Sequence, residues 1–292
     1  MTAPSTASGQ WLPRLVFAPS FVLSMLFIYG LIAWNGYLSL TASRLMPNYT
    51  LVGLEQYVLL FQSDRWWVAV RNMAVFGGLF IAGAMGLGLL LAILLDQKIR
   101  GEGVLRTIYL YPMAISFIVT GTAWKWILNP GLGLEHLMHR WGFESFRFDW
   151  LVDADMAIYC VVIAGVWQSA GFVMALFLAG LRGIDDSIVK AAQVDGASLP
   201  RIYWRIVIPT LRPVIFSTLL VVSHLAIKSF DLVMALTAGG PGYATDLPAT
   251  YMYAMAFTRG QIGQGAAAAT VMLATIAAIV VPYLYSELRA RR

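Results

Sequence analysis

Charged side chains are scarce in this sequence. Of its 292 residues only 12% are Asp, Glu, Lys or Arg, whereas 59% are hydrophobic. About a quarter of the residues of an ordinary soluble domain are charged, so the chain has too few charges to cover a water-facing surface of its size. A disordered chain needs the opposite composition, with many charges and few apolar residues. Both a soluble enzyme and a disordered protein are therefore poor fits.

Cysteine and histidine are also scarce. The single cysteine, Cys160, excludes an internal disulfide, and three histidines leave a metal site of His and Cys ligands poorly supplied. Glu135, His136 and His139 lie close in sequence, but we interpret them as a solvated helix face rather than a metal cluster. No Gly-Lys pair occurs, so the chain has no P-loop for nucleotide.

Long apolar runs, in contrast, are abundant. A bilayer core of about 30 Å takes about 20 helical residues, and continuous rather than alternating runs favour helices over barrel strands. The first run is too long for a signal peptide, so we interpret it as a retained anchor. We predict an all-α membrane protein whose transmembrane domain, residues 15–286, has six helices, at about 15–40, 73–95, 108–128, 156–181, 214–236 and 264–286.

The basic residues indicate the orientation of the chain. The formal net charge is +5, and the charges lie between apolar runs, which indicates a membrane rather than a nucleic acid as the partner. Twelve Lys and Arg residues fall on the side that holds both termini and the second and fourth loops, against six on the other side. By the positive-inside rule the first side is cytoplasmic. Residues 1–14 and 287–292 are then the cytoplasmic termini.

Small residues in two spans mark places where helices can approach closely. Gly78, Ala82 and Gly86 recur every four residues, and Gly265 precedes the run 266–269 of alanines. Close backbone contact drives helix packing in lipid. We expect packing within the chain, with contact to a second membrane subunit as the alternative.

The loop between the fourth and fifth spans, residues 182–213, is the largest cytoplasmic segment. Residues 184–192 have helical character, Asp195-Gly196 suits a turn, and Pro209 and Pro213 stop a regular helix before the next span. The loop either lies on the membrane as an amphipathic segment or inserts into a protein cleft. The small residues around the turn favour the cleft.

This loop resembles the EAA loop of binding-protein-dependent ABC importer permeases. Ala191-Ala192, Asp195-Gly196-Ala197 and Ile208-Pro209 carry the resemblance. Other segments are similar to the maltose-type sugar permeases: Tyr111-Pro112, Trp124-Lys125-Trp126, Trp167-Gln168, Phe230-Asp231 and Thr237 through Gly242. The chain looks most like the first of two permeases of a glucose or mannose importer in a Gram-negative bacterium. Lys190 departs from the pattern, because the family usually has Glu there, and a salt bridge at that position is in doubt.

The resemblance implies a type I ABC importer permease fold in a bacterial inner membrane. A coupling helix would dock on a cytoplasmic ATP-binding subunit, which binds ATP, so the chain itself needs no cofactor. The other implied partners are a second homologous permease and a periplasmic sugar-binding protein. The residues expected to couple to the ATPase are Lys190, Ala191, Ala192, Asp195, Gly196, Ala197 and Ser198.

Polar residues within the spans are candidates for a sugar path. Lys228 and Asp231 are three apart in the fifth span, hence on one helical face where they can pair, and His224 lies four residues before Lys228 on the same side. They either stabilise the bundle or line the path. Trp167, Gln168 and Ser169 combine an aromatic face with hydrogen-bonding groups, as sugars require. Trp124 and Lys125 fit a membrane interface better.

The segment that contains Gly239, Gly240 and Pro241 is expected to be a flexible outer loop. In the family this region lies near the outer gate or the binding protein; a re-entrant turn without contacts is the alternative. Other functions stay open: a permease for another sugar or a polyol, a passive channel or a stand-alone transporter, and a membrane-embedded enzyme. The enzyme would have only His224, Lys228 and Asp231 as candidate catalytic groups. A stand-alone transporter would show paired broken helices, and the sequence predicts none.

Overall fold

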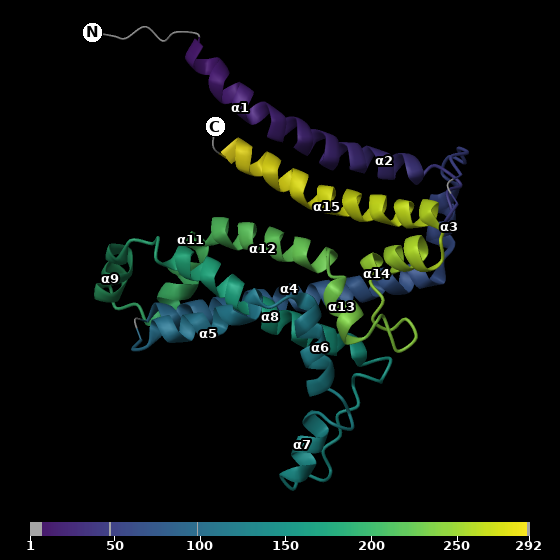
Figure 1. Ribbon diagram of the computed structural model, residues 1–292. Helices are drawn as coiled ribbons and strands as arrows, with labels where there is room; N and C mark the ends of the chain where they lie inside the picture. The colour runs from purple at the N-terminus through teal and green to yellow at the C-terminus, as the bar shows by residue number, and fades with distance from the viewer. Residues whose placement is uncertain (1–7, 47, 98, 291–292) are drawn as a thin grey trace. The chain divides into compact units, whose positions relative to one another are not determined.

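The computed structural model in Figure 1 describes residues 8–46, 48–97 and 99–290. Within these ranges four helices are long and apolar enough to cross a membrane: Arg14–Leu38, Asp64–Asp96, Ala157–Leu181 and Ile262–Pro282. Two sharply bent pairs pass the same test together, Glu102–Ala114 with Phe117–Ile127 and Leu199–Thr210 with Arg212–Ile227. The prediction of an all-α membrane protein is confirmed, and the spans number six if each bent pair crosses once.

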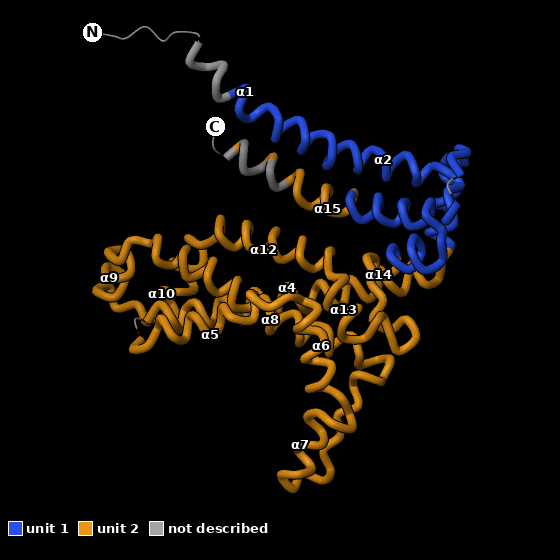
Figure 2. Tube along the Cα trace, viewed as in Figure 1, with its two compact units in different colours: residues 1–62, 252–273 blue, residues 63–251, 274–292 orange. Residues whose placement is uncertain are grey.

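The described residues form two compact units, coloured separately in Figure 2. The first comprises residues up to Gln62 together with Met252–Leu273. It holds α1 (Ser8–Ser24), a π-helical turn (Met25–Tyr29), α2 (Gly30–Leu38), α3 (Glu55–Gln62), a second π-helical turn (Ala254–Thr258) and the first part of α15 (Ile262–Ala290).

The second unit comprises Ser63–Tyr251 and the residues from Ala274 onward. Its candidate membrane helices are α4 (Asp64–Asp96), α8 (Ala157–Leu181) and, as parts of bent pairs, α5 (Glu102–Ala114), α6 (Phe117–Ile127) and α12 (Arg212–Ile227). The short helix α13 (Asp231–Leu236) follows α12. Its shorter elements are α7 (Leu134–Arg140), α9 (Asp186–Val194), α10 (Leu199–Ile202), a π-helical turn (Tyr203–Val207), α11 (Ile208–Thr210) and most of α14 (Pro248–Tyr253).

Glycines let α4 and α8 lie against each other in the second unit (Figure 1). A Cβ atom at Gly88 would lie 2.5 Å from Cγ1 of Val173, and one at Gly83 would lie 2.8 Å from Cγ2 of Val166. A Cβ at Gly171 of α8 would overlap the carbonyl oxygen of Tyr109 in α5. The core therefore depends on hydrogen-sized side chains at these crossings, as is usual for membrane helices.

The small-residue stripe of Gly78, Ala82 and Gly86 lies on another face of α4. All three are exposed, and a Cβ at Gly78 or Gly86 would meet no atom of the described residues within 4 Å. The expected packing of this stripe is therefore absent within the second unit: the helix repeat of 3.6 residues turns its neighbours Gly77, Gly83 and Gly88 toward the core of that unit instead.

The second stripe behaves as expected within the first unit. Ala266, Ala267 and Ala268 are buried. The side-chain amide of Asn35 in α2 donates to the carbonyl oxygen of Ala266 (3.2 Å) and to the hydroxyl of Thr270 (3.1 Å). These bonds require a close approach of α2 to α15, which the small side chains permit.

The third and fifth predicted spans are not continuous helices. Residues 108–128 are divided at Ile115-Ser116 by a bend of 100°, and residues 214–236 are divided at residues 228–230, between α12 and α13. Pro112 removes a backbone donor just before the first break, and the Ser116 hydroxyl accepts the Val119 N–H to restart the helix as α6. The absence of broken helices was a wrong prediction.

The remaining spans follow the predicted order, with shifted ends. The second begins at Asp64 rather than at residue 73, because Arg65 and Arg71 are helical and Arg65 has an acidic partner. The third-to-fourth connection projects from the second unit and carries α7 (Figure 1). There Glu135 accepts the Phe148 N–H (3.0 Å), and a ring nitrogen of His139 lies 2.7 Å from the Phe146 oxygen. Glu135 and His139 thus hold residues 146–148 against α7.

Candidate functional site

Helix α9 is the centre of the loop between α8 and α12. The Asp185 carboxylate caps it by accepting the Ser187 N–H at 2.8 Å. That backbone bond, together with the Ser187 hydroxyl, lowers the pKa of Asp185. The helix was predicted at residues 184–192 and lies two residues later, at Asp186–Val194. The capping Asp185 explains where it starts.

The predicted turn at Asp195-Gly196 is present. Gly196 adopts a positive φ of 79°, a conformation that glycine enters without steric cost. The N–H of Ala197 returns to the carbonyl oxygen of Ala192 at 3.0 Å, a pattern common where helices end in a left-handed glycine. Gly196 therefore ends α9 and redirects the chain into α10.

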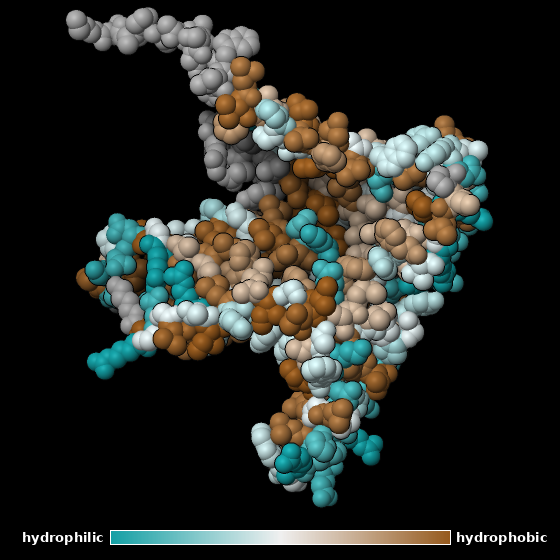
Figure 3. All heavy atoms as spheres, viewed as in Figure 1, coloured by the Kyte–Doolittle hydropathy of each residue, from teal (hydrophilic) through white to brown (hydrophobic). Residues whose placement is uncertain are grey.

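Helix α9 presents an apolar outer face. Val194 is 88% exposed and Ile188 is 44% exposed. Among the predicted coupling residues, Ala192 is buried and Ala197 is half-buried; the exposed ones are Lys190, Ala191, Asp195, Gly196 and Ser198. Figure 3 shows hydrophilic side chains gathered around this end of the second unit. An exposed apolar stripe inside a polar region is the usual mark of a docking surface.

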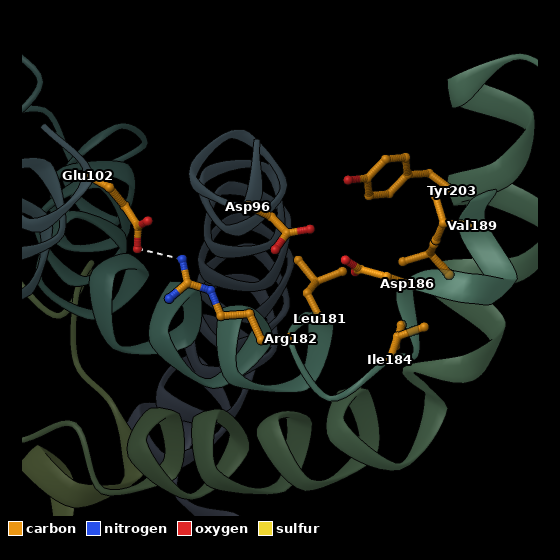
Figure 4. A pocket seen from close by; sticks show the side chains of 9 residues that line it. Asp96, Glu102, Leu181, Arg182, Ile184, Asp186, Val189 and Tyr203 are labelled. Carbon is orange, nitrogen blue, oxygen red and sulfur yellow. Dashed lines mark hydrogen bonds and ion pairs between the residues drawn. The ribbon is translucent and has the colours of Figure 1, made fainter. Parts of the chain in front are cut away.

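A cavity of about 490 Å³ lies behind α9 (Figure 4). Arg182 pairs with Glu102 at 2.5 Å on one side, while Asp96, Asp186 and Tyr203 point into the same space (Figure 4). The side chain of Gln97 donates to the Tyr203 hydroxyl at 2.9 Å. No local sequence pattern predicts this cluster, because its members come separately from α4, α5, the C-terminal cap of α8, α9 and the Tyr203–Val207 turn.

The break between α12 and α13 contains a second cavity of about 110 Å³. Phe117, Leu225, Lys228, Ser229, Phe230, Asp231 and Leu232 line it. Lys228 ends α12 and Asp231 begins α13, so the prediction that they share one face of a continuous helix is wrong. The two charges nevertheless border the same cavity. His224 is exposed on α12 and does not line it.

The three candidate sugar-path residues of α8 lie in different environments. Gln168 and Ser169 are buried, whereas Trp167 is 42% exposed. The Gln168 amide donates to the carbonyl oxygen of Ile115 at 2.7 Å, at the break between α5 and α6. Trp167 meets Trp124 of α6 edge to face, with 5.9 Å between the ring centroids. Trp124 therefore packs against an α8 side chain rather than standing alone at an interface.

The segment from Thr237 to Leu247 is a hydrogen-bonded loop rather than a loose one. The Thr245 hydroxyl contacts the Thr237 hydroxyl (2.6 Å) and the Gly240 oxygen (2.9 Å). Gly239 is buried with a φ of 88°, while Gly240 and Pro241 are half-buried. Side chains that the sequence did not single out, Arg65 and Asp246 among them, join this loop to α4.

The sequence profile of the "binding-protein-dependent transport system inner membrane component" matches residues 84–291. The chain belongs to this family. The permease is 40% identical over 273 residues to a probable ABC transporter permease protein of Pyrococcus horikoshii, covering 93% of this chain and 94% of that one. It is 37% identical over 271 residues to the xylose/arabinose import permease protein XacH of Haloferax volcanii, covering 91% and 85%.

A third relative is the sn-glycerol-3-phosphate transport system permease protein UgpA of Agrobacterium fabrum, 31% identical over 273 residues with 92% of each chain covered. The fold matches a bacterial ABC transporter involved in alginate import, with a TM-score of 0.82, 22% identity and coverage of 98% and 96%. That transporter has also been solved with an alginate pentasaccharide-bound periplasmic protein. The permease is thus a transport subunit in the inner membrane, and the alternative of a membrane-embedded enzyme is excluded.

Proposed function

We propose that this permease carries a sugar inward across the inner membrane, with ATP bound and hydrolysed by a separate cytoplasmic subunit. This proposal rests on the exposed apolar face of α9 beside the Gly196 turn, because a partner protein can bind there and bury that face. Lys190 stands on the same helix where the family has Glu. Binding of the ATPase subunit to α9 then depends on shape and apolar contact more than on a salt bridge at position 190.

The connections of α9 explain how a pull on it would reach the membrane. Residues 182–185 join its start directly to α8, and α10 and α11 join its end to α12. Helix α8 carries Trp167, and α12 ends at Lys228 beside the smaller cavity. Closure of two ATPase subunits would therefore move both helices and switch the site between outward and inward access. A second homologous permease would complete the path.

The smaller cavity is the proposed part of the sugar path. Lys228 and Asp231 supply a cation and a carboxylate, and Phe117 and Phe230 supply apolar faces for sugar C–H groups. Because these two charges balance, the lining has no excess positive charge to attract an anionic solute such as a sugar phosphate. We therefore favour a neutral monosaccharide such as glucose or mannose over the phosphate-bearing solute named for one relative. Another neutral sugar or a polyol is the alternative. We assign Trp167 to the path, and Gln168, Ser169 and His224 to its support.

On the opposite side of the membrane, the Gly239-Gly240-Pro241 loop is proposed to meet a periplasmic sugar-binding protein or to form the outer gate. The excess of basic residues on the α9 side supports a cytoplasmic position for both termini. The relative solved with a periplasmic protein gives a precedent for such a partner.

The coupling proposal is tested by replacing Gly196 with phenylalanine in the assembled transporter, reconstituted with its second permease, ATPase and binding protein. Gly142 is a matched control, because it also has a positive φ of 92° and open space around it but lies near α7. We expect Gly196→Phe to abolish sugar-stimulated ATP hydrolysis and Gly142→Phe to keep it. Full stimulation by an assembled Gly196→Phe complex would contradict the proposal. A panel of neutral and phosphorylated sugars identifies the solute.

A further inference from the structure

The 237–247 loop is fixed to the start of α4 by a buried ion pair. Nε of Arg65 lies 2.6 Å from Oδ2 of Asp246. The Asp246 side chain is 1% exposed, and that of Arg65 is 17% exposed. A carboxylate this deeply buried needs a full set of partners, and the second oxygen has one: Oδ1 accepts a hydrogen bond from the Thr250 hydroxyl at 2.6 Å.

Further contacts join the loop backbone to the same helix. The Asn72 amide, two turns after Arg65, donates to the carbonyl oxygens of Tyr243 (3.1 Å) and Asp246 (3.0 Å). The Arg65 guanidinium lies over the Tyr243 ring, 4.3 Å from its centroid, a favourable cation–π arrangement. The loop is thus held at its side chains and at its main chain by one face of α4.

Asp246 also sets the shape of the glycine segment. A Cβ at Gly239 would lie 3.3 Å from Oδ1 of Asp246, so the carboxylate packs directly under the Gly239 backbone. The Thr245 N–H bonds the Gly239 oxygen at 3.2 Å. Asp246 therefore lies beneath the loop, while Gly242 and Tyr243 stay exposed at its tip.

We propose that Asp246 and Arg65 are positioning residues that hold the 237–247 loop in the form that the sugar-binding protein engages. This inference rests on the proposed function, because it names the elements that present one of its partner surfaces. The pair touches neither the sugar nor the ATPase. Its loss should weaken the response to the binding protein and leave hydrolysis without that protein intact.

The test titrates sugar-loaded binding protein against the reconstituted transporter and records ATP hydrolysis. Asp246→Asn is expected to raise the half-saturating concentration at least about tenfold, equivalent to 1.4 kcal/mol, with the rate in the absence of binding protein unchanged. Thr250→Val, which keeps the Asp246 charge but removes the hydroxyl that bonds Asp246 and the Leu247 backbone, should shift it in the same direction. Arg71→Gln is the control, since Arg71 is exposed on the same helix, and should behave as wild type.

The inference is overturned by an unchanged half-saturating concentration in assembled Asp246→Asn and Thr250→Val complexes, or by an equal fall in the rate without binding protein. The double variant Arg65→Gln/Asp246→Asn should be no worse than either single variant, and additive effects also overturn it. Wild-type stimulation reports on the proposed function, whereas the ratio of variant to wild type reports on this inference.

A second readout needs no binding protein. Cys160 is the only native cysteine and is buried, so Ala244→Cys can be labelled selectively with a maleimide. Adding Asp246→Asn is expected to speed labelling at least about fivefold, because the loop then leaves α4 more often. Equal labelling rates with and without Asp246→Asn contradict the inference, even if no binding protein stimulates the complex.

Discussion

The side-chain amide of Gln168 in α8 donates a hydrogen bond to the carbonyl oxygen of Ile115 across 2.7 Å. Ile115 lies at the break between α5 and α6, where the helix leaves backbone groups without their usual partners. Gln168 supplies one of those partners inside the protein, which is how broken helices are tolerated at membrane depth. Its role is therefore to stabilise the bend beside the proposed path.

Removing this bond should destabilise the permease. Gln168→Leu leaves the part-buried Ile115 carbonyl without its donor, and we expect the free energy of unfolding to fall by about 1–3 kcal/mol. Ser169→Ala is the matched control, because the Ser169 hydroxyl is buried without a hydrogen-bond partner among the described residues and its loss should be neutral or stabilising. Thermal unfolding of the purified complex measures both. Equal midpoints for the two variants would refute the assignment.

The glycine at the α5–α8 crossing should be intolerant of any side chain. Gly171→Ala places a methyl group on the Tyr109 carbonyl oxygen, and overpacking of this kind costs about 1–3 kcal/mol or more. Gly86→Ala points into open space and should leave unfolding of the isolated chain unchanged. The yield and thermal midpoint of each variant check the pair. A stable Gly171→Ala protein would show that α5 and α8 do not meet as described.

The capping bond of Asp185 predicts how the stability of α9 changes with pH. The pKa of Asp185 is lowered in the folded chain by the Ser187 N–H and hydroxyl. The stabilisation it gives is therefore fully present above the unfolded pKa of about 3.9 and is lost as the pH falls through the lower folded value. Asp185→Ala should reduce coupled ATP hydrolysis at neutral pH, and Asp185→Asn, which still accepts the bond, should retain more. The reverse order of the two activities would exclude a capping role.

The charge at the start of α13 should matter for transport. If Asp231 accepts hydrogen bonds from the sugar, Asp231→Asn loses a charge-assisted contact of about 1.5–3 kcal/mol, so the apparent sugar affinity in uptake should fall about 10- to 100-fold. Asp149→Asn, an exposed carboxylate outside the cavity, is the control. Unchanged uptake by Asp231→Asn would remove this residue from the path.

The sequence allowed the helical class, the span order and the Asp195-Gly196 turn to be predicted, because long apolar runs and a glycine turn are local signals. It did not reveal the breaks at Ile115 and at Lys228. The segment around Ile115 remains apolar through its break, and the polar residues at the second break, Lys228 and Asp231, also suit one face of a continuous helix. The group that makes the first break tolerable, Gln168, lies far away in the chain.

Contacts between distant segments explain the other failures. The loop at Gly239 looked flexible from its composition, but Arg65, 181 residues from Asp246, holds it. The stripe of Gly78, Ala82 and Gly86 has the spacing of a packing face, yet spacing alone does not say which face of α4 meets α8. Asp96, Glu102 and Tyr203 line one cavity only because the fold brings their three separate elements together.

The central claim is that the α9 turn is held by an ATP-hydrolysing subunit. Ser198 follows the turn and is exposed, so Ser198→Cys with a short bifunctional crosslinker tests the contact in intact cells. Leu132→Cys, on the segment that carries α7, is the control. We expect Ser198→Cys to capture the nucleotide-hydrolysing subunit, with a yield that changes with nucleotide, and Leu132→Cys not to. No capture at Ser198 in an assembled, active transporter would contradict the account.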